Sequence, residues 1–442
     1  MSKTIIIIGA GLAGLSAALQ AAENGCNVKL VSSFPSERAQ SVMAEGGINA
    51  ALNTKDENDS PEEHFTDTIK AACGLADPNA VWGMTQAAPE LVHWLLKLGV
   101  RFNMSGYDDV DLRNFGGQKK KRTAFAQSDT GKQIMTAMID AVRRKEASGM
   151  VERFSHHSFL TLRLCGNICC GCVIRDEYSQ ETVELPGDAV IVATGGMHGL
   201  FGNTTGSLSN TGEVTAELFR LGVPLANGEM IQYHPTTVKC GGKRMLISEA
   251  ARGEGGRLFA MKDGKQWYFM EEKYPELGNL MPRDITAREI WKVSHESEVF
   301  LDMTEISEEI ISNKLSGLAD DCMTYLHKDI RKEPVSVLPG IHYFMGGILV
   351  DEQHRTPIQN LYAAGECCAQ YHGANRLGGN SLLGALYGGR VAAKSACEQA
   401  DVVDLSCATQ IDFPPASQIS EIKQLNKVMQ ETMGVVRNEN TL

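Results

Sequence analysis

The sequence predicts an α/β fold in which a parallel sheet is interrupted by an inserted α+β segment. Three short apolar runs have the composition of strands that are buried on both faces of a parallel sheet, and glycine follows each of them. The runs are Thr4 to Ile8, Ala189 to Ala193 and Leu361 to Ala364. Between the second and third runs, from about residue 226 to residue 338, helical and strand patterns mix. The chain therefore leaves a parallel sheet and later returns to it.

The first apolar run opens a dinucleotide-binding motif. Gly9-Ala-Gly-Leu-Ala-Gly14 follows it directly, and then come an apolar helix, Leu15 to Asn24, and a second strand, Asn27 to Ser32. In this motif the first glycine makes the turn, the second admits a pyrophosphate, and the third lets helix and strand pack closely. The second strand ends in Ser32-Ser33 and lacks the acidic residue that binds the ribose of NAD. This departure counts against NAD.

The remaining elements follow from periodicity and from turn residues. In order, these are a polar stretch at 38–52 centred on Glu45-Gly-Gly47, helices at Leu91–Leu98 and Thr130–Lys145, a β-meander from Arg153 to Glu184, a linker at Pro414-Pro415 and a charged helix from Ile419 to Met433.

A glycine-rich loop near the end of the chain is where the chemistry converges. His372-Gly-Ala-Asn-Arg-Leu-Gly-Gly-Asn-Ser-Leu-Leu383 opens onto a helix that runs from Leu382 to Ala400. Asn380 and Ser381 are N-cap residue types. The free N–H groups of the first turn can bind an anion or an electron-rich ring edge. Arg376 offers a planar fork suited to a carboxylate. One segment can therefore hold a cofactor and an acidic substrate.

Composition excludes several classes of protein. The chain has 442 residues and a net charge of −12, and its one basic cluster, Lys119-Lys-Lys-Arg122, is predicted to be a solvated loop, so no nucleic acid partner is expected. No unbroken apolar stretch of about 20 residues occurs, so no membrane span is expected. Twelve cysteines without a secretion signal predict reduced thiols and a cytoplasmic location. The cluster Cys165, Cys169, Cys170 and Cys172 fits no standard metal-ligand spacing.

Five motifs together resemble the flavoprotein subunits of fumarate reductase and succinate dehydrogenase, a family that also includes L-aspartate oxidase. The resemblance covers nearly the whole chain and implies an FAD-binding Rossmann-like domain with an inserted α+β capping domain. The expected parts are residues 1–225 and 339–405 for the FAD-binding domain, 226–338 for the capping domain, and 406–442 for a linker and the first helix of a C-terminal helical domain. The motifs are Gln232-Tyr-His-Pro-Thr236, Ser248-Glu-Ala-Ala-Arg-Gly-Glu-Gly-Gly256, Pro282-Arg-Asp284, His342-Tyr-Phe-Met-Gly-Gly347 and His372-Gly-Ala-Asn-Arg376.

The resemblance implies that the chain reduces fumarate to succinate by hydride transfer from flavin N5. Arg283 matches the family's proton donor, and Glu249 and Arg252 match the relay that reprotonates it. The residues that match its substrate-binding positions are His234, Ser248, His342 and Arg376. Each has a structural alternative when taken singly: His234 can cap a strand end, His342 can be a packed core residue, and Arg283 can be a cap partner for Asp284.

The resemblance also implies FAD as cofactor, held without a covalent bond. Many members attach FAD through a histidine, and Gln40 stands at that position, where it cannot form the bond. Glu213 stands where the family has a ribose-binding aspartate. The expected cofactor-binding residues are Gly9, Gly11, Gly14, Ser32, Ser41, Glu45, Gly46, Gly47, Thr194, Gly195, Glu213, Glu366, Asn380, Ser381 and Leu382.

Two rival functions are weighed against fumarate reduction. L-Aspartate oxidases carry a glutamate that pairs with the substrate ammonium at the place of Phe115, and phenylalanine cannot form that pair, so Phe115 favours the reductase. A non-catalytic electron-transfer flavin module would bind FAD without turnover, and the intact set of substrate residues argues against it. The partners implied are a small dicarboxylate substrate and an iron–sulfur electron-transfer subunit.

Overall fold

The computed structural model describes residues 2–107, 109–401 and 419–437. Its central sheet is wholly parallel, with the strand order β20-β10-β1-β2-β6. Ile8 lies opposite both Val31 and Val192, so the strands end together at one edge of the sheet. The predicted α/β class is confirmed. The strands are β1 (Thr4–Ile8), β2 (Asn27–Ser32), β6 (Val151–Ser155), β10 (Ala189–Val192) and β20 (Leu361–Ala363).

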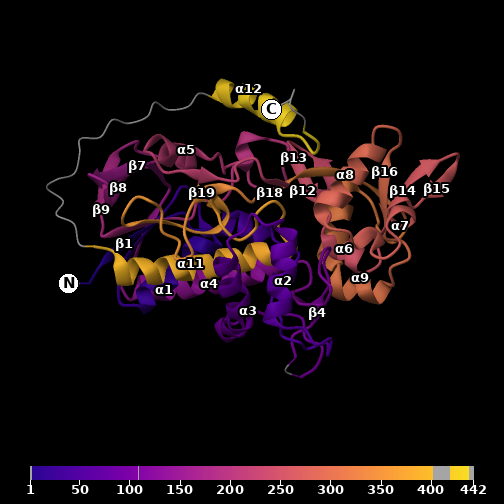
Figure 1. Ribbon diagram of the computed structural model, residues 1–442, viewed down its shortest axis with the longest axis horizontal. Coiled ribbons are helices and arrows are strands. Elements are labelled where there is room, and N and C mark those ends of the chain that lie inside the picture. The colour runs from indigo at the N-terminus through magenta and orange to yellow at the C-terminus, as the bar shows by residue number, and fades with distance from the viewer. Residues whose placement is uncertain (1, 108, 402–418, 438–442) are drawn as a thin grey trace.

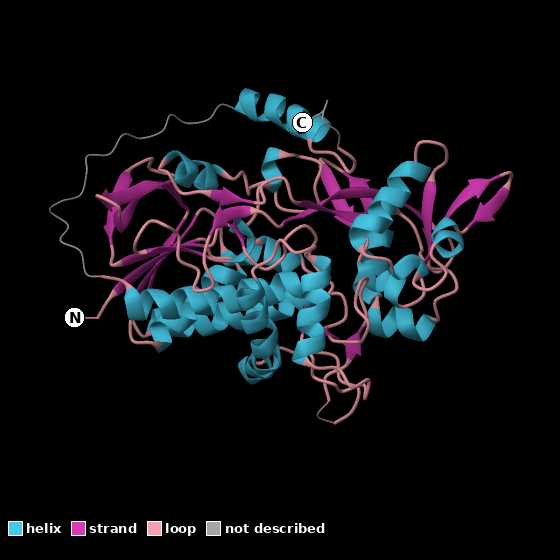
Figure 2. Cartoon of the chain, in the orientation of Figure 1, coloured by secondary structure: helices cyan, strands magenta, loops and turns pink. Residues whose placement is uncertain are grey.

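Helices cover one face of this sheet and a small antiparallel sheet lies on the other (Figures 1 and 2). The predicted meander is confirmed in its later strands, but β6 joins the central sheet. It follows helix α4, and a strand that follows a crossover helix pairs in parallel. The covering elements are α1 (Leu12–Glu23), α3 (Pro78–Leu98), α4 (Thr130–Ala147) and α11 (Asn380–Gln399) on one face, and β7 (His157–Cys165), β8 (Ile168–Asp176), β9 (Thr182–Pro186) and α5 (Glu213–Arg220) on the other.

Several predicted helix boundaries were wrong. Helix α1 begins at Leu12, three residues early, because a glycine inside its first turn still allows helical backbone. Helix α3 ends at Gly99 as expected but begins far upstream and contains Pro89. Helix α11 begins at Asn380, with the left-handed Gly379 as its N-cap. Asn380 and Ser381 therefore lie inside the first turn and are not caps.

A second lobe with its own apolar core occupies the other end of the molecule (Figure 1). Residues of the proposed capping segment, 226–338, form most of it, and β18 crosses the proposed boundary to pair with β12. The elements are β12 (Ile231–Cys240), β13 (Lys243–Leu246) and β18 (Leu338–Phe344) in one sheet, β14 (Arg257–Lys262), β15 (Lys265–Trp267), β16 (Val299–Asp302) and β17 (Val335–Ser336) in another, and α6 (Glu249–Gly253), α7 (Phe269–Lys273), α8 (Arg283–Val293), α9 (Glu308–Lys314) and α10 (Ser316–Asp321).

The remaining elements are a helix near the end of the chain, a helix that packs on α3, and two small sheets of short strands. The predicted terminal helix is observed as α12 (Ile419–Thr432), while Pro414-Pro415 lies outside the described residues. The others are α2 (Pro61–Ala71), β3 (Ile48–Asn49), β4 (Leu112–Arg113), β5 (Thr123–Ala124), β11 (Leu225–Ala226), β19 (Gly347–Leu349) and β21 (Cys368–Ala369).

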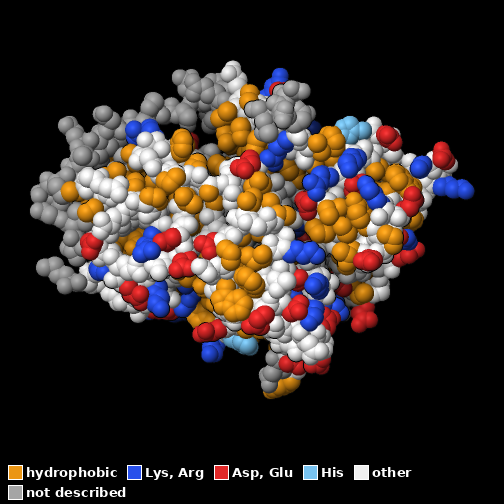
Figure 3. Space-filling model, viewed as in Figure 1, with side chains coloured by type: hydrophobic (Ala, Val, Ile, Leu, Met, Phe, Trp, Pro, Cys, Tyr) orange, Lys and Arg blue, Asp and Glu red, His pale blue; other side chains and the backbone are white. Residues whose placement is uncertain are grey.

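The surface agrees with the charge pattern of the sequence. On the face shown in Figure 3, basic, acidic and apolar side chains are interspersed. Within the described part of the chain, no helix has the length and apolar character that a bilayer span needs. Among the described residues, ten cysteines carry free thiols.

Arg122 contradicts the prediction of a solvated basic loop. Its side chain is fully buried and pairs with two carboxylates from the segment before and within α2. The Arg122 Nη2 atom lies 2.9 Å from Asp59 Oδ1, and Nη1 lies 3.0 Å from Asp67 Oδ2. The pattern of basic residues could not show this, since both partners lie more than fifty positions upstream.

We predict that Arg122→Leu strongly destabilises the fold. The substitution leaves two buried carboxylates without their cation, which should lower the free energy of unfolding by about 3–5 kcal/mol. Urea unfolding of the holoprotein measures this. Lys119→Ala, at an exposed position of the same cluster, is the control and should change the free energy by less than about 0.5 kcal/mol. Equal stability of the two variants would contradict the prediction.

Candidate active site

A cavity of about 630 Å³ lies at the carboxyl ends of the central strands and extends to the second lobe. Its position agrees with the general rule that ligands of open parallel sheets bind beyond the strand ends. Nearly all of the sequence-predicted site residues line it. The three exceptions are Gly14, Arg252 and Asn380.

The glycine motif has the geometry of a pyrophosphate cradle. A Cβ atom on Gly9 would lie 2.2 Å from the Ala193 carbonyl oxygen, and one on Gly14 would lie 1.8 Å from the Gly9 carbonyl oxygen. Both glycines are therefore required by close backbone packing. A Cβ on Gly11 would meet no protein atom closer than 3.8 Å, because it would project into the cavity. The second glycine thus faces the space where a pyrophosphate would approach the start of α1.

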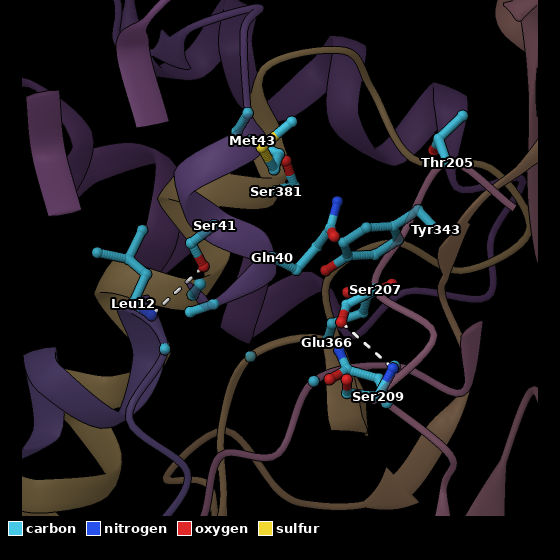
Figure 4. A pocket seen from close by; sticks show the side chains of 18 of the residues that line it. Leu12, Gln40, Ser41, Met43, Thr205, Ser207, Ser209, Tyr343, Glu366 and Ser381 are labelled. Atoms are coloured by element: carbon cyan, nitrogen blue, oxygen red, sulfur yellow. Dashed lines mark hydrogen bonds between the residues drawn. The ribbon is translucent and has the colours of Figure 1, made fainter. Parts of the chain in front are cut away.

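Several strand ends and loops converge on the same space. Thr194 and Gly195 follow β10, Ser32 ends β2, and Ser41 lies in the short 3₁₀ helix Gln40–Met43. Figure 4 shows Gln40, Ser41, Glu366 and Ser381 around the cavity. The other predicted cofactor residues in the lining are Glu45, Gly46, Gly47, Glu213 and Leu382.

The Asn380 side chain does not face the cofactor space. Its Oδ1 accepts a hydrogen bond from Asn49 Nδ2 at 2.7 Å and lies 2.9 Å from His64 Nε2, while its Nδ2 donates to Thr68 Oγ1 at 3.0 Å. These buried contacts hold the first turn of α11 in place on the side away from the cavity. Asn380 therefore supports the helix start that faces the cavity.

Two histidines in the substrate half of the cavity are neutral. The His234 and His342 rings lie 5.1 Å apart. Burial lowers the pKa of each well below its usual value, and the neighbouring Arg283 lowers both further. Thr205 Oγ1 lies 2.8 Å from His342 Nδ1, which leaves Nε2 available to a ligand. The histidines can therefore offer hydrogen bonds, but the positive charge of the site comes from arginine.

Glu249 lies between Arg252 and Arg283. Its Oε2 lies 2.6 Å from Arg283 Nη2 and 2.7 Å from Arg283 Nε, and its Oε1 lies 3.3 Å from Arg252 Nη2. Burial raises the pKa of Glu249, but the two guanidinium groups outweigh burial, so the net shift is downward. Glu249 is therefore ionised. Arg252 lies behind Glu249 on helix α6 and does not line the cavity.

Gln232 is a site residue that the sequence interpretation missed. Its Oε1 accepts hydrogen bonds from Arg283 Nη1 at 3.0 Å and from Arg376 Nη2 at 2.9 Å. Its Nε2 donates to Asn375 Oδ1 at 2.8 Å and to the Arg376 carbonyl oxygen at 2.7 Å. One buried amide thus spaces two guanidinium groups. Its position two residues before His234 on a strand was the available signal, since i and i+2 share a face.

The charge of this half of the site suits a dianion. In the cluster around Glu249 and the Gln232 amide, Arg252, Arg283 and Arg376 contribute three positive charges and Glu249 one negative charge, which leaves a net charge of about +2 beside two neutral histidines; Arg244, which also lines the cavity, is not part of this cluster. Burial and the nearby Arg283 lower the pKa of Arg376 to about 9, so its guanidinium remains charged at neutral pH. A dicarboxylate would compensate this charge.

Comparison with known proteins identifies the family. Residues 4–382 match the FAD binding domain family. The succinate dehydrogenase flavoprotein subunit of Bacillus subtilis is 44% identical over 413 residues, which are 91% of this chain and 70% of that protein. The chain belongs to the succinate dehydrogenase and fumarate reductase flavoprotein family. It is an FAD-dependent oxidoreductase of that type.

Further relatives agree with this assignment. The 8-methylmenaquinol:fumarate reductase flavoprotein subunit of Wolinella succinogenes is 32% identical over 100% of this chain and 75% of that protein. The L-aspartate oxidase of Streptomyces coelicolor is 33% identical over 100% of this chain and 78% of that protein. A structure of the Escherichia coli quinol fumarate reductase FrdA superposes with a TM-score of 0.89 at 28% identity, covering 100% of this chain and 80% of that one.

Phe115 forms an apolar wall of the cavity. Its side chain is almost completely buried, and Cβ atoms on Gly46 and Gly378 would each lie 2.9 Å from its ring. The ring is therefore packed between two glycine-containing loops. The aromatic ring provides no carboxylate for a substrate ammonium.

Proposed function

We propose that the chain reduces fumarate, or a closely related unsaturated dicarboxylate, to the saturated dicarboxylate. The observation that supports this most directly is the Gln232-bridged pair of Arg283 and Arg376 in an FAD-family cavity, with Glu249 behind Arg283 and two neutral histidines alongside. This arrangement offers two cations for two carboxylates and a path for one proton.

The roles of the side chains follow from their contacts. FAD, when bound, supplies the hydride. Arg283 gives the proton to the other alkene carbon, although a guanidinium alone is a poor acid. Arg252 then gives a proton to Glu249, and Glu249 passes a proton to Arg283, which restores the proton that Arg283 gave to the substrate.

The substrate carboxylates need separate contacts. Arg376, His342 and Ser248 stabilise the charge that moves onto a carboxylate during reduction, and this stabilisation is greater in the transition state than in the ground state. His234 binds the other end of the substrate.

The decisive functional assay compares two substrates. With reduced viologen as electron donor under anaerobic conditions, the holoprotein should reduce fumarate. With L-aspartate and oxygen it should form no iminoaspartate, because Phe115 cannot pair with the substrate ammonium. Aspartate oxidation without fumarate reduction would replace this proposal with the oxidase, and FAD binding without either activity would favour an electron-transfer module.

We propose that FAD is held without a covalent bond. Gln40 lines the cavity, and its amide has no nucleophilic ring nitrogen that could bond to the flavin. Acid precipitation of the holoprotein should release essentially all yellow colour to the supernatant. Gln40→His is the matched variant, and flavin that stays in its pellet would show that residue 40 occupies the linkage position. Flavin retained in the wild-type pellet would contradict the prediction.

The partner and location are proposed on the family's pattern. Several relatives are named as flavoprotein subunits, so we propose that an iron–sulfur subunit delivers electrons to this chain. We propose a cytoplasmic location, with contact to a membrane only through such a partner.

A further inference from the structure

Arg244 is a buried cation that the proposed mechanism does not use. It lies on β13, its residue is only 7% exposed, and it lines the cavity. Burial lowers its pKa, and no carboxylate of the described residues opposes that shift. A buried guanidinium without a counter-ion is unfavourable unless something else compensates it. A ligand with negative charge would provide that compensation.

The Arg244 guanidinium is held so that one end stays free. Nε contacts Thr237 Oγ1, and Nη2 donates to the carbonyl oxygens of Thr237 at 3.1 Å and Leu338 at 3.4 Å. Nη1 makes no hydrogen bond to any described residue. It is also not among the fully buried polar atoms that lack a hydrogen-bond partner. Nη1 therefore keeps some accessible surface, on a cavity-lining side chain that three contacts hold in place.

The position of this guanidinium relates it to the substrate residues. The side chain passes over β12 and reaches β18 at Gly340, where a Cβ atom would lie 2.6 Å from Arg244 Cδ and 2.9 Å from Nε. Gly340 is the register partner of His234, and His342 follows two residues later on the same strand. Arg244 thus lies beside the strand positions that carry both predicted substrate histidines.

The turn between β12 and β13 adds further positive charge. Lys243 is exposed and lines the cavity together with Arg244, and Lys239 is the register partner of Arg244. This hairpin therefore presents a cationic rim, and rims of one charge raise the encounter rate of ligands of opposite charge.

We propose that Arg244 forms an outer carboxylate-binding subsite, which captures the dicarboxylate before it reaches Arg283 and Arg376. The inference rests on the proposed function, because it assumes the same class of substrate. It assigns Arg244 to substrate capture and not to the chemical step. Losing it should therefore affect KM and ligand affinity much more than kcat.

Two variants test the subsite in different ways. Arg244→Gln removes the charge. Gly340→Ala keeps the charge but displaces the Arg244 side chain and the Thr237 hydroxyl that contacts it, and the Gly340 backbone is not in the left-handed region, so alanine causes no backbone strain there. In both, KM for fumarate should rise about tenfold with kcat within about twofold, and Arg244→Gln should make kcat/KM less dependent on salt. Lys265→Gln, on an exposed hairpin of the same lobe, is the control for net charge and should match wild type.

A binding measurement separates this proposal from the proposed function. Succinate and malonate titrated into the oxidised holoprotein should perturb the flavin absorbance, with Kd about tenfold higher in both variants. FAD content and circular dichroism establish that each variant is folded. If wild type binds these dianions and reduces fumarate, but both variants do so equally well, the subsite is refuted and the function stands. If wild type binds neither dianion, both proposals fail.

Discussion

Replacing Arg283 with alanine is expected to abolish fumarate reduction while FAD remains bound. Arg283 is the cation of this cavity that contacts both the Glu249 carboxylate and the Gln232 amide. In the proposed mechanism, its removal takes away the proton donor and one charge that stabilises the substrate dianion. Each effect alone contributes about 10²-fold or more, so turnover should fall by about 10⁴-fold or beyond the detection limit.

The matched control for this prediction lies on the same helix. Arg288 is on α8 one turn further along, where it forms an exposed pair with Asp284 at 2.6 Å. Arg288→Ala should retain wild-type turnover, since exposed pairs contribute little to stability and Arg288 does not line the cavity. The assay is viologen oxidation by fumarate, with flavin absorbance as the measure of loading. Residual activity of Arg283→Ala above about one tenth of wild type would exclude Arg283 as proton donor.

The parts of the fold that sequence predicted well are those with local signals. Strands β1 and β2 were predicted to the residue, because β1 is a continuous apolar run that ends at a glycine and β2 follows at the place where the dinucleotide-binding motif requires its second strand. The start of α1 was missed because its glycine suggested a loop. Pro89 concealed the first half of α3 in the same way. Local composition thus identified the helices, but it misplaced their ends where the helix tolerates a glycine or proline.

Non-local contacts set the limit for the site. The motif residues converge as the resemblance implied, yet Asn380 turns away from the cofactor space because Asn49, His64 and Thr68 provide its partners. The sequence suggested that Arg122 is a surface charge, whereas in the structure two carboxylates that are distant in sequence pair with it. A sequence shows which side chains could interact, but it does not show which distant partner each one finds.

Gln232→Leu tests the bridge between Arg283 and Arg376, which the sequence analysis did not predict. Leucine has a similar volume but no acceptor for Arg283 and Arg376 and no donor for Asn375. The two guanidinium groups carry like charges and repel each other, and without the shared acceptor oxygen they should move apart. We expect kcat/KM for fumarate to fall about 10²-fold, because a misplaced donor loses much of its effect.

Gln232→Glu distinguishes spacing from charge. Its carboxylate can still accept from both arginines, although it loses the Nε2 donor to Asn375 and to the Arg376 carbonyl oxygen, and it neutralises part of the charge that attracts the substrate. Its loss should therefore appear mainly in KM, whereas Gln232→Leu should lose kcat as well. Steady-state kinetics of FAD-loaded protein measure both, with the exposed Gln399→Leu as control. Wild-type kinetics in Gln232→Leu would mean that the two arginines hold their positions without the bridging amide.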